Sequence, residues 1–364
     1  MTTLINRELS QSQTSQHATA AITDRMGRPL RDLRVSLTDE CNFRCTYCMP
    51  EELFGEGHPF LSPKSLLTFE EIITLVRHMA KLGVQKVKIT GGEPLLRPGV
   101  HRLVRDLYAI PGIEDVGLIT NGFHLSGVAE RLYQAGLRRV TVSLDSIVPE
   151  TFDQIVGRGG GLPRVIDGIR TARKVGFDPV KINMVVQRGI NDQEALKMAD
   201  FARAEGVELR YIEYMDVGRR NTYEESLLVP NSEIRDRLHE IHPIRPLDAD
   251  YYGEVADTYE YLDGGGRVGF ISSMTQPFCG SCTRLRVSAD GKLYRCLFSG
   301  IGMDARAIMR DESMDETERT IKVDQAVRRF WGIREDRYSE RRAEEGPLPG
   351  STRPERVEMY RMGG

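Results

Sequence analysis

The chain has 364 residues, of which 40% are hydrophobic and 28% are charged, and its formal net charge is −3. This composition is ordinary for a globular protein with a large core, built as one domain with an extension or as two domains. The small net charge gives no electrostatic argument for nucleic-acid or membrane binding, and no run reaches the roughly 18 apolar residues that a membrane span needs.

Residues 1–30 are polar and rich in Ser and Gln, which predicts a flexible tail without signal-peptide features. From residue 31 to 221, short β-branched runs alternate with helical patterns. Strands are predicted at 34–37, 86–90, 115–120, 139–145, 181–186 and 207–215, and helices near 68–83, 99–109, 125–135, 163–175 and 191–205. Six strands alternating with helices indicate a parallel sheet but fall short of the eight strand–helix units in a closed (β/α)8 barrel. We therefore expect an α/β fold, a partial (βα)6 TIM-like barrel.

The pattern changes after residue 222. Polar and acidic stretches and the hairpin signal Asp290-Gly291 predict a small antiparallel region. Two helical patterns follow, near 303–311 and 316–331. We expect a C-terminal α+β extension over 222–332 and an extended tail over 333–364, which ends in Gly363-Gly364.

Six cysteines lie in two groups of three. Cys41, Cys45 and Cys48 form C-x3-C-x2-C just after the first predicted strand, where parallel α/β barrels place their active sites. The second group, Cys279, Cys282 and Cys296, lies on and beside the predicted hairpin. A structural zinc ion takes four ligands, whereas three thiolates can hold a [4Fe–4S] cluster and leave one iron open. Each group is therefore a candidate iron–sulfur site.

Two other uses of these cysteines are open. Disulfides are typical of small secreted chains, and this chain is long and charged. A zinc site could recruit His58 as a fourth ligand of the first group, and a non-catalytic zinc-binding module is therefore an alternative. Iron–sulfur clusters and free thiolates need reducing conditions, so we expect a cytoplasmic protein.

Basic residues recur on the predicted strands. Lys86 and Lys88 are two apart and share a strand face, as do Arg284 and Arg286 just after Cys282. Ammonium groups inside a parallel barrel are costly without an anion, so a shared cavity would suit a polyphosphate. For any single residue, a solvated surface position is the alternative. The candidates are Arg34, Lys86, Lys88, Lys181, Arg210, Arg284 and Arg286.

The first cysteine motif, with Tyr47 before its last cysteine, resembles that of the radical S-adenosylmethionine (SAM) enzymes. The resemblance implies that Cys41, Cys45 and Cys48 hold a catalytic [4Fe–4S] cluster whose open iron binds SAM. The string Thr90-Gly91-Gly92-Glu93-Pro94 resembles the family's GGEP element. By the same resemblance, the SAM-binding residues are Tyr47, Gly92, Ser143 in VSLD and Met215 in YIEYMDVG.

From about Arg31 onward, the chain resembles the GTP 3′,8-cyclase family, which begins molybdenum-cofactor biosynthesis. The strings that carry this are RDLRVSLTDECNFRCTYCMP, ITGGEP, TNG, VSLD, YIEYMDVG, FCGSCTRLRVSADGKLYRCLF and the terminal Gly-Gly. The resemblance implies a second [4Fe–4S] cluster on Cys279, Cys282 and Cys296 that binds the guanine. It also implies substrate contacts from Thr120 and the seven basic residues. Gly363 and Gly364 would enter the active site.

The implied reaction converts GTP to (8S)-3′,8-cyclo-7,8-dihydroguanosine 5′-triphosphate. Implied partners are GTP, a one-electron donor protein and the cyclic pyranopterin monophosphate synthase that receives the product, and a homodimer is compatible with the resemblance. Lys88 departs from the family, which usually has Arg there, and residues 302–350 look unlike the family sequence. Another radical SAM enzyme with a C-terminal cluster, such as a peptide maturase, is the alternative function.

Overall fold

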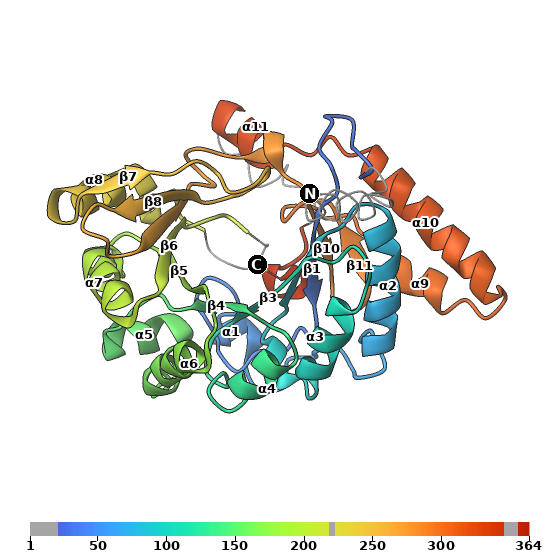
Figure 1. The fold of residues 1–364 in the computed structure, drawn as a ribbon, viewed down its shortest axis with the longest axis horizontal. Helices are drawn as coiled ribbons and strands as arrows, with labels where there is room; N and C mark the ends of the chain where they lie inside the picture. The colour runs from blue at the N-terminus through green and yellow to red at the C-terminus, as the bar shows by residue number, and fades with distance from the viewer. Residues whose placement is uncertain (1–20, 218–222, 346–355, 364) are drawn as a thin grey trace, which may run out of the picture.

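The computed structural model describes residues 21–217, 223–345 and 356–363. Their strands form one twelve-stranded sheet in the order β12-β11-β10-β1-β2-β3-β4-β5-β6-β9-β8-β7, which curves into an open barrel with helices outside (Figure 1). The six expected strands are parallel and pair in chain order, which confirms the partial barrel. They are β1 (Asp32–Ser36), β2 (Lys86–Thr90), β3 (Asp115–Thr120), β4 (Arg139–Ser143), β5 (Val180–Val186) and β6 (Glu208–Glu213).

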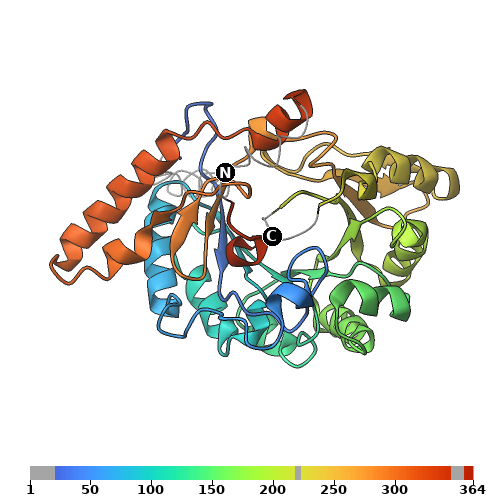
Figure 2. The same cartoon turned by 180° about the vertical axis from the view of Figure 1, so that it is seen from behind.

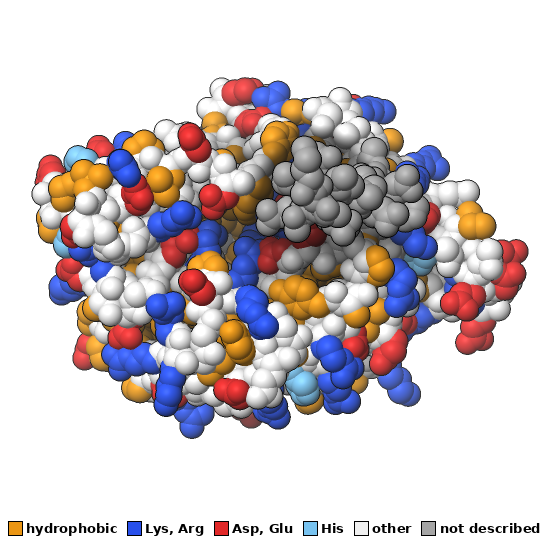
Figure 3. All heavy atoms as spheres, viewed as in Figure 1, with side chains coloured by type: hydrophobic (Ala, Val, Ile, Leu, Met, Phe, Trp, Pro, Cys, Tyr) orange, Lys and Arg blue, Asp and Glu red, His pale blue; other side chains and the backbone are white. Residues whose placement is uncertain are grey.

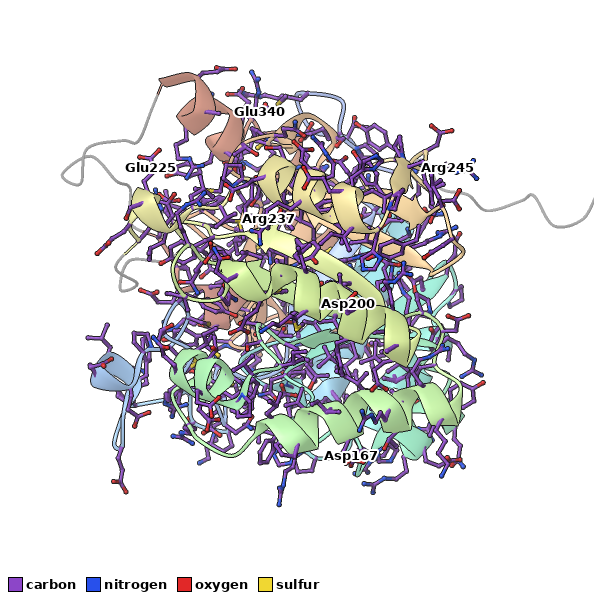
Figure 4. The ribbon with its side chains drawn as sticks, turned by 90° about the vertical axis from the view of Figure 1, so that its left-hand side faces the viewer. Asp167, Asp200, Glu225, Arg237, Arg245 and Glu340 are labelled. Atoms are coloured by element: carbon purple, nitrogen blue, oxygen red, sulfur yellow. The ribbon has the colours of Figure 1, made fainter. Side chains whose placement is uncertain are left out.

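The crossover helices cover the outer face of these strands. They are α2 (Phe69–Lys81), α3 (Val100–Tyr108), α4 (Ala129–Gln134), α5 (Pro149–Val156), α6 (Leu162–Val175) and α7 (Ala195–Glu205). The start of α2 follows from its sequence: Thr68 and Glu71 form the expected capping box, and Ile72, Leu75 and Met79 point into the core. In Figure 4, the labels on Asp167, Asp200 and Arg237 mark α6, α7 and α8 (Asn231–Ile241), stacked along one side of the molecule.

The C-terminal half extends the sheet at both edges. Strand β9 (Arg267–Ile271) pairs in parallel with β6, and β8 (Asp257–Tyr261) and β7 (Ile244–Pro246) follow it in antiparallel order. On the other edge, β10 (Arg284–Val287) pairs in parallel with β1, and β11 (Lys292–Tyr294) and β12 (Met303–Asp304) continue the sheet. The expected hairpin at Asp290-Gly291 joins β10 to β11. The extension is thus antiparallel within itself, as expected, but it joins the barrel through parallel pairs.

The remaining elements are short helices and one long one. Helix α1 (Glu51–Phe54) lies in the first cysteine loop, and α9 (Ala305–Met309) and α10 (Glu316–Gly332) follow β12. Single 3-10 turns cover Pro94–Leu96, Asp192–Glu194, Glu225–Leu227 and Cys279–Ser281. None of the helices in the described part of the chain combines the length and apolar character needed to cross a membrane.

Both expected tails contain packed segments. Arg28 and Leu30 are completely buried, and the Trp331 indole N–H donates to the Arg28 carbonyl over 3.2 Å. Residues 22–30 are therefore not part of a flexible tail, because they bond to the barrel and to the end of α10. The described residues of the segment 333–364 are also not simply extended: they form α11 (Tyr338–Glu345) and α12 (Met359–Met362), and α12 lies inside the curve of the barrel (Figure 2).

Candidate functional site

The first cysteine group lies on the loop after β1. Backbone N–H groups of Arg44 and Thr46 donate to carbonyls at the end of α5, and the Arg44 guanidinium donates to the Cys41 carbonyl over 2.7 Å. These bonds fix the loop. All three cysteines are free and partly buried. Burial, and then the neighbouring Cys41 and Cys48 thiols, raise the pKa of Cys45.

Three adjacent thiols whose burial opposes ionisation suit a positively charged metal centre, because metal binding stabilises thiolates. The set Cys41, Cys45 and Cys48 therefore fits a cluster bound by three cysteines.

The four expected SAM-binding residues occupy different positions in the structure. The Tyr47 hydroxyl donates to Asp145 Oδ2 over 2.7 Å, and Met215 follows β6 and lines the main cavity. Ser143 ends β4 beside Asn183 of β5. Gly92 packs against the loop itself, since a Cβ there would lie 2.1 Å from the Glu40 carbonyl oxygen.

Asp145 was not among the predicted site residues, although it belongs to the VSLD string. It is buried, and it accepts from Tyr47 and, over 2.8 Å, from the Val185 amide. Burial raises its pKa to about 6. A polar residue directly after a barrel strand was the signal that could have identified it.

The cavity that reaches from the second cysteine group into the barrel interior is here called the main cavity because it contains these cysteines, not because of its size. It holds about 1080 Å³ of empty space, including its open mouth, and Cys279, Cys282 and Cys296 all line it. The sheet register sets Arg286, Arg34 and Lys88 side by side on β10, β1 and β2. Five of the seven predicted basic residues line this cavity: Arg34, Lys88, Arg210, Arg284 and Arg286.

These cations are crowded. Burial and then Arg284 lower the pKa of Arg34 to about 10. Burial, followed by the neighbouring arginines, holds the pKa of Lys88 and that of Arg286 well below the usual range. The Arg34 Nε is buried without a hydrogen-bond partner. The cavity wall therefore favours an anion, because an anion would offset both the repulsion and the lost hydration.

A second cavity lies toward the amino ends of the strands and shares Lys88 and Arg210 with the first. Lys181 lines it and donates to Glu208 over 2.8 Å, while Arg210 donates to the same carboxylate over 2.6 Å. Arg139 also lines this cavity and was not predicted. The available signal was its place on the predicted strand that contains Ser143, four residues earlier and therefore on the same face of the strand. On this side of the molecule, Lys and Arg side chains gather around a central hollow (Figure 3).

Two predicted substrate contacts are placed elsewhere. Thr120 is buried and its hydroxyl donates to Glu93 Oε1 over 2.7 Å; Ile119, the preceding residue of β3, faces the cavity instead. The prediction that Thr120 lies along the cleft is therefore wrong. Lys86 lines neither cavity, because it lies two residues nearer the start of β2 than Lys88 and its ammonium group covers the Tyr251 ring.

The C-terminal tail reaches this site. Tyr360 and Met362 are buried, and the Gly363 carbonyl accepts a hydrogen bond from Arg286. Gly363 has φ +68°, and a Cβ there would lie 2.0 Å from Thr90 Cγ2, so the position requires glycine. Gly364 lies outside the described residues.

An ion pair holds the tail upstream of Gly363. Arg356 contacts Asp216 over 3.2 Å and donates to its carbonyl over 2.7 Å. The Tyr338 hydroxyl donates to the same carboxylate over 3.2 Å, and the Arg356 guanidinium lies over the Tyr338 ring. We call Asp216, Arg356 and Tyr338 the tail latch. Asp216 directly follows Met215, so the latch ties the tail to the cavity wall.

The second cysteine group differs from the first in its charged surroundings. Burial would raise the pKa of Cys282, but Arg284 and Arg334 lower it to about 6. The Cys296 thiol is also buried, and its pKa is raised to about 11. The three thiols line one wall of the main cavity and are free, so they fit a second cluster bound by three cysteines.

Comparison with known proteins identifies both halves of the chain. Residues 35–202 match the radical SAM superfamily, and residues 207–340 match the family named Molybdenum Cofactor Synthesis C. A GTP 3′,8-cyclase of Acidothermus cellulolyticus is 46% identical over 95% of this chain and 100% of that protein. A GTP 3′,8-cyclase of Staphylococcus haemolyticus is 44% identical over 90% of this chain and 94% of that protein.

The fold also has solved relatives. The crystal structure of Streptococcus suis SuiB bound to S-adenosylmethionine superposes with a TM-score of 0.56 at 14% identity, and covers 83% of this chain and 68% of that one. This likeness concerns the fold alone. With both halves matched and relatives above 40% identical along nearly the whole chain, this protein belongs to the GTP 3′,8-cyclase family of radical SAM enzymes.

Proposed function

We propose that this protein is a GTP 3′,8-cyclase. It would use SAM and two [4Fe–4S] clusters to convert GTP to (8S)-3′,8-cyclo-7,8-dihydroguanosine 5′-triphosphate, the first step of molybdenum-cofactor biosynthesis. The observation that carries the proposal is the main cavity, where five crowded cations face the second cysteine group. The triphosphate of a nucleotide would supply negative charge to neutralise these cations. Its base would lie toward the second cysteine group, which lines the same cavity.

The two cysteine groups have different tasks in this proposal. Cys41, Cys45 and Cys48 hold the cluster that binds SAM, with Tyr47, Gly92, Ser143 and Met215 around the SAM molecule. With SAM bound, a reduced cluster on these cysteines would supply the 5′-deoxyadenosyl radical chemistry needed to remove a hydrogen atom from C3′ of the ribose. Cys279, Cys282 and Cys296 hold the cluster that orients the guanine.

The basic residues position the triphosphate. Arg34, Lys88, Arg284 and Arg286 lie on one side of the cavity, on three adjacent strands. Arg210 and Lys181 extend the set toward the second cavity, where both are held by Glu208 until a phosphate competes for them. Charge-assisted bonds from several strands fix the nucleotide in one orientation, which brings its ribose to a defined place.

The tail completes the site. Gly363 lies between Thr90, which begins the TGGEP turn, and Arg286, which lines the main cavity. A tail segment packed at this place would help to exclude water from a radical reaction. Gly363 and the following Gly364 are therefore proposed as active-site residues.

The reaction also needs partners. One electron is required to start each cycle, so we propose a one-electron donor protein in the cytoplasm. The cyclised triphosphate would pass to cyclic pyranopterin monophosphate synthase. A homodimer is compatible with the proposal but is not needed to complete the site described above.

The test is an anaerobic assay of the reconstituted protein with dithionite, SAM and GTP, in which 5′-deoxyadenosine and the nucleotide product are identified by mass spectrometry. We expect both products. SAM cleavage with GTP unchanged would reject GTP as substrate and favour another radical SAM reaction, such as peptide maturation.

A matched pair of variants links the assay to the cavity. Arg34→Gln removes a buried cavity cation, and Arg245→Gln removes an exposed one from β7. Loss of one charge-assisted bond of about 1.5–3 kcal/mol predicts a roughly 10- to 100-fold loss of GTP turnover for Arg34→Gln. Arg245→Gln should keep the wild-type rate.

A further inference from the structure

A buried network of charged side chains supports the second cysteine group from behind. Asp24 lies in the segment before β1, and Arg334 lies just after α10. Arg28 Nε donates to Asp24 Oδ2 over 2.6 Å, and Arg334 Nη1 lies 3.4 Å from the same oxygen. These three side chains are at most 2% exposed. Two distant segments of the chain are thus joined by one carboxylate.

This network contacts two of the three cysteines directly. Arg28 Nη1 donates to the Cys279 carbonyl over 2.8 Å. Arg334 Nη1 donates to the Cys282 carbonyl over 2.7 Å, and its Nη2 donates to the Cys282 sulfur over 3.1 Å. The Arg334 guanidinium also lies over the Trp331 ring, 4.5 Å from the ring centre. Arg334 is therefore held on three sides and presents one N–H to sulfur.

We propose that Arg334 is a positioning residue for the second cluster, and that its hydrogen bond to the Cys282 sulfur raises the reduction potential of that cluster. Asp24 and Arg28 orient it. This inference rests on the proposed function, because it requires a cluster on Cys279, Cys282 and Cys296.

The physical argument concerns the charge of the cluster. Reduction adds an electron, and a cationic N–H donor to a ligand sulfur stabilises the more negative state. Second-shell donors of this kind are a common means of tuning metal centres. A purely structural role of Arg334 would be met by its bond to the Cys282 carbonyl and its contact with Asp24. The bond to sulfur is the contact that couples Arg334 to the electronic state of the cluster.

The contact also gives a function to residues 21–30. Removing Asp24 would leave two buried guanidinium groups without their shared carboxylate, and uncompensated buried charge is strongly destabilising. The segment before the barrel is thus the anchor that keeps the Arg334 donor in place.

The test is an EPR-monitored redox titration of the second cluster. The full chain carries Cys41→Ser, Cys45→Ser and Cys48→Ser, so only the second cluster assembles. In this background, Arg334→Gln removes the sulfur donor, and Arg334→Lys keeps a charged donor. Arg295→Gln is the matched control, because Arg295 lines the same cavity and its side chain bonds to the Phe330 carbonyl.

We expect the midpoint potential to fall in Arg334→Gln, to fall less in Arg334→Lys, and to stay near the starting value in Arg295→Gln. Unchanged potentials in both Arg334 variants would overturn the inference, as would an equal fall in Arg295→Gln. If Arg334→Gln does not fold, Arg334→Lys decides alone, since the lysine cannot reproduce both bonds to Cys282. Failure of the parent protein to assemble any second cluster would instead reject the proposed function.

Discussion

Breaking the tail latch should release the C-terminal tail without unfolding the barrel. Arg356→Met removes the cation from Asp216, and both side chains are at most 5% exposed. Loss of one partner of a buried ion pair costs about 3–5 kcal/mol. Arg342, 3.7 Å from Asp216, retains part of the pairing, so we take the lower end, about 3 kcal/mol.

The lost free energy lowers the stability of the docked tail and not that of the barrel, because Arg356 connects the tail to the cavity wall. A loss of about 3 kcal/mol corresponds to a roughly 100-fold higher open population. Hydrogen exchange followed by mass spectrometry reports this directly. Amides of residues 356–363 should exchange faster by about that factor, while amides of β1–β6 keep their protection.

The control is Arg361→Met, which removes an exposed cation from α12 within the same tail. We expect little change in exchange for this variant. Unchanged exchange in Arg356→Met, or equal acceleration in both variants, would refute the latch. Acceleration throughout the barrel would show that Arg356 stabilises the whole fold.

Three further results are expected. Gly363→Ala places a Cβ 2.0 Å from Thr90 Cγ2, so GTP turnover should fall at least tenfold, roughly a 1.4 kcal/mol effect. The control is Gly332→Ala, which should match the wild type in the same assay because its Cβ would meet no atom within 4 Å. Burial raises the pKa of Glu93 to about 7 from an ordinary 4.5. Between pH 4.5 and pH 7 the folded state therefore binds more protons than the unfolded state. Urea titrations should show that the unfolding free energy falls by about 3 kcal/mol as the pH rises through this window. An equal dependence of the unfolding free energy on pH in Glu93→Gln would refute this. Burial and neighbouring arginines lower the pKa of Lys88, so GTP binding should take up protons at alkaline pH and weaken as pH rises. Calorimetry in buffers of different ionisation enthalpy measures this uptake, which should be smaller in Lys88→Met than in the wild type; equal uptake would contradict the assignment to Lys88.

Much of the fold was predictable because its signals are local. Each parallel strand is a short β-branched run followed by an amphipathic helix, and the Thr68 capping box fixed a helix start. The parallel pairing of β9 with β6 and of β10 with β1 has no such signal. The paired residues are more than 50 positions apart in the first case and 252 apart in the second, so the pairing depends on how the barrel edges lie in space.

Sequence spacing was most informative where residues close together in the chain share one loop or one strand face. Two cysteine triplets and basic residues two apart on strands are such patterns, and the main cavity brings the second triplet together with Lys88, Arg284 and Arg286. Sequence spacing did not determine which side chains of a strand face the cavity. Thr120 turns toward Glu93 because the alternation of β3 gives the cavity face to Ile119. Arg334 could not be predicted, since nothing near it in the sequence shows that it meets Cys282.

The strand pairs that join the C-terminal half to the barrel also limit where the chain can be divided into independent fragments. The matched families meet near residue 207, but hydrogen-bonded strand pairs cross this point: β5 pairs with β6, and β1 pairs with β10. A gene split at this point would produce two fragments with unpaired strand edges, which invite aggregation. Both cysteine triplets lie on loops beside strands of the same hydrogen-bonded sheet. Their spacing is therefore fixed when the sheet forms.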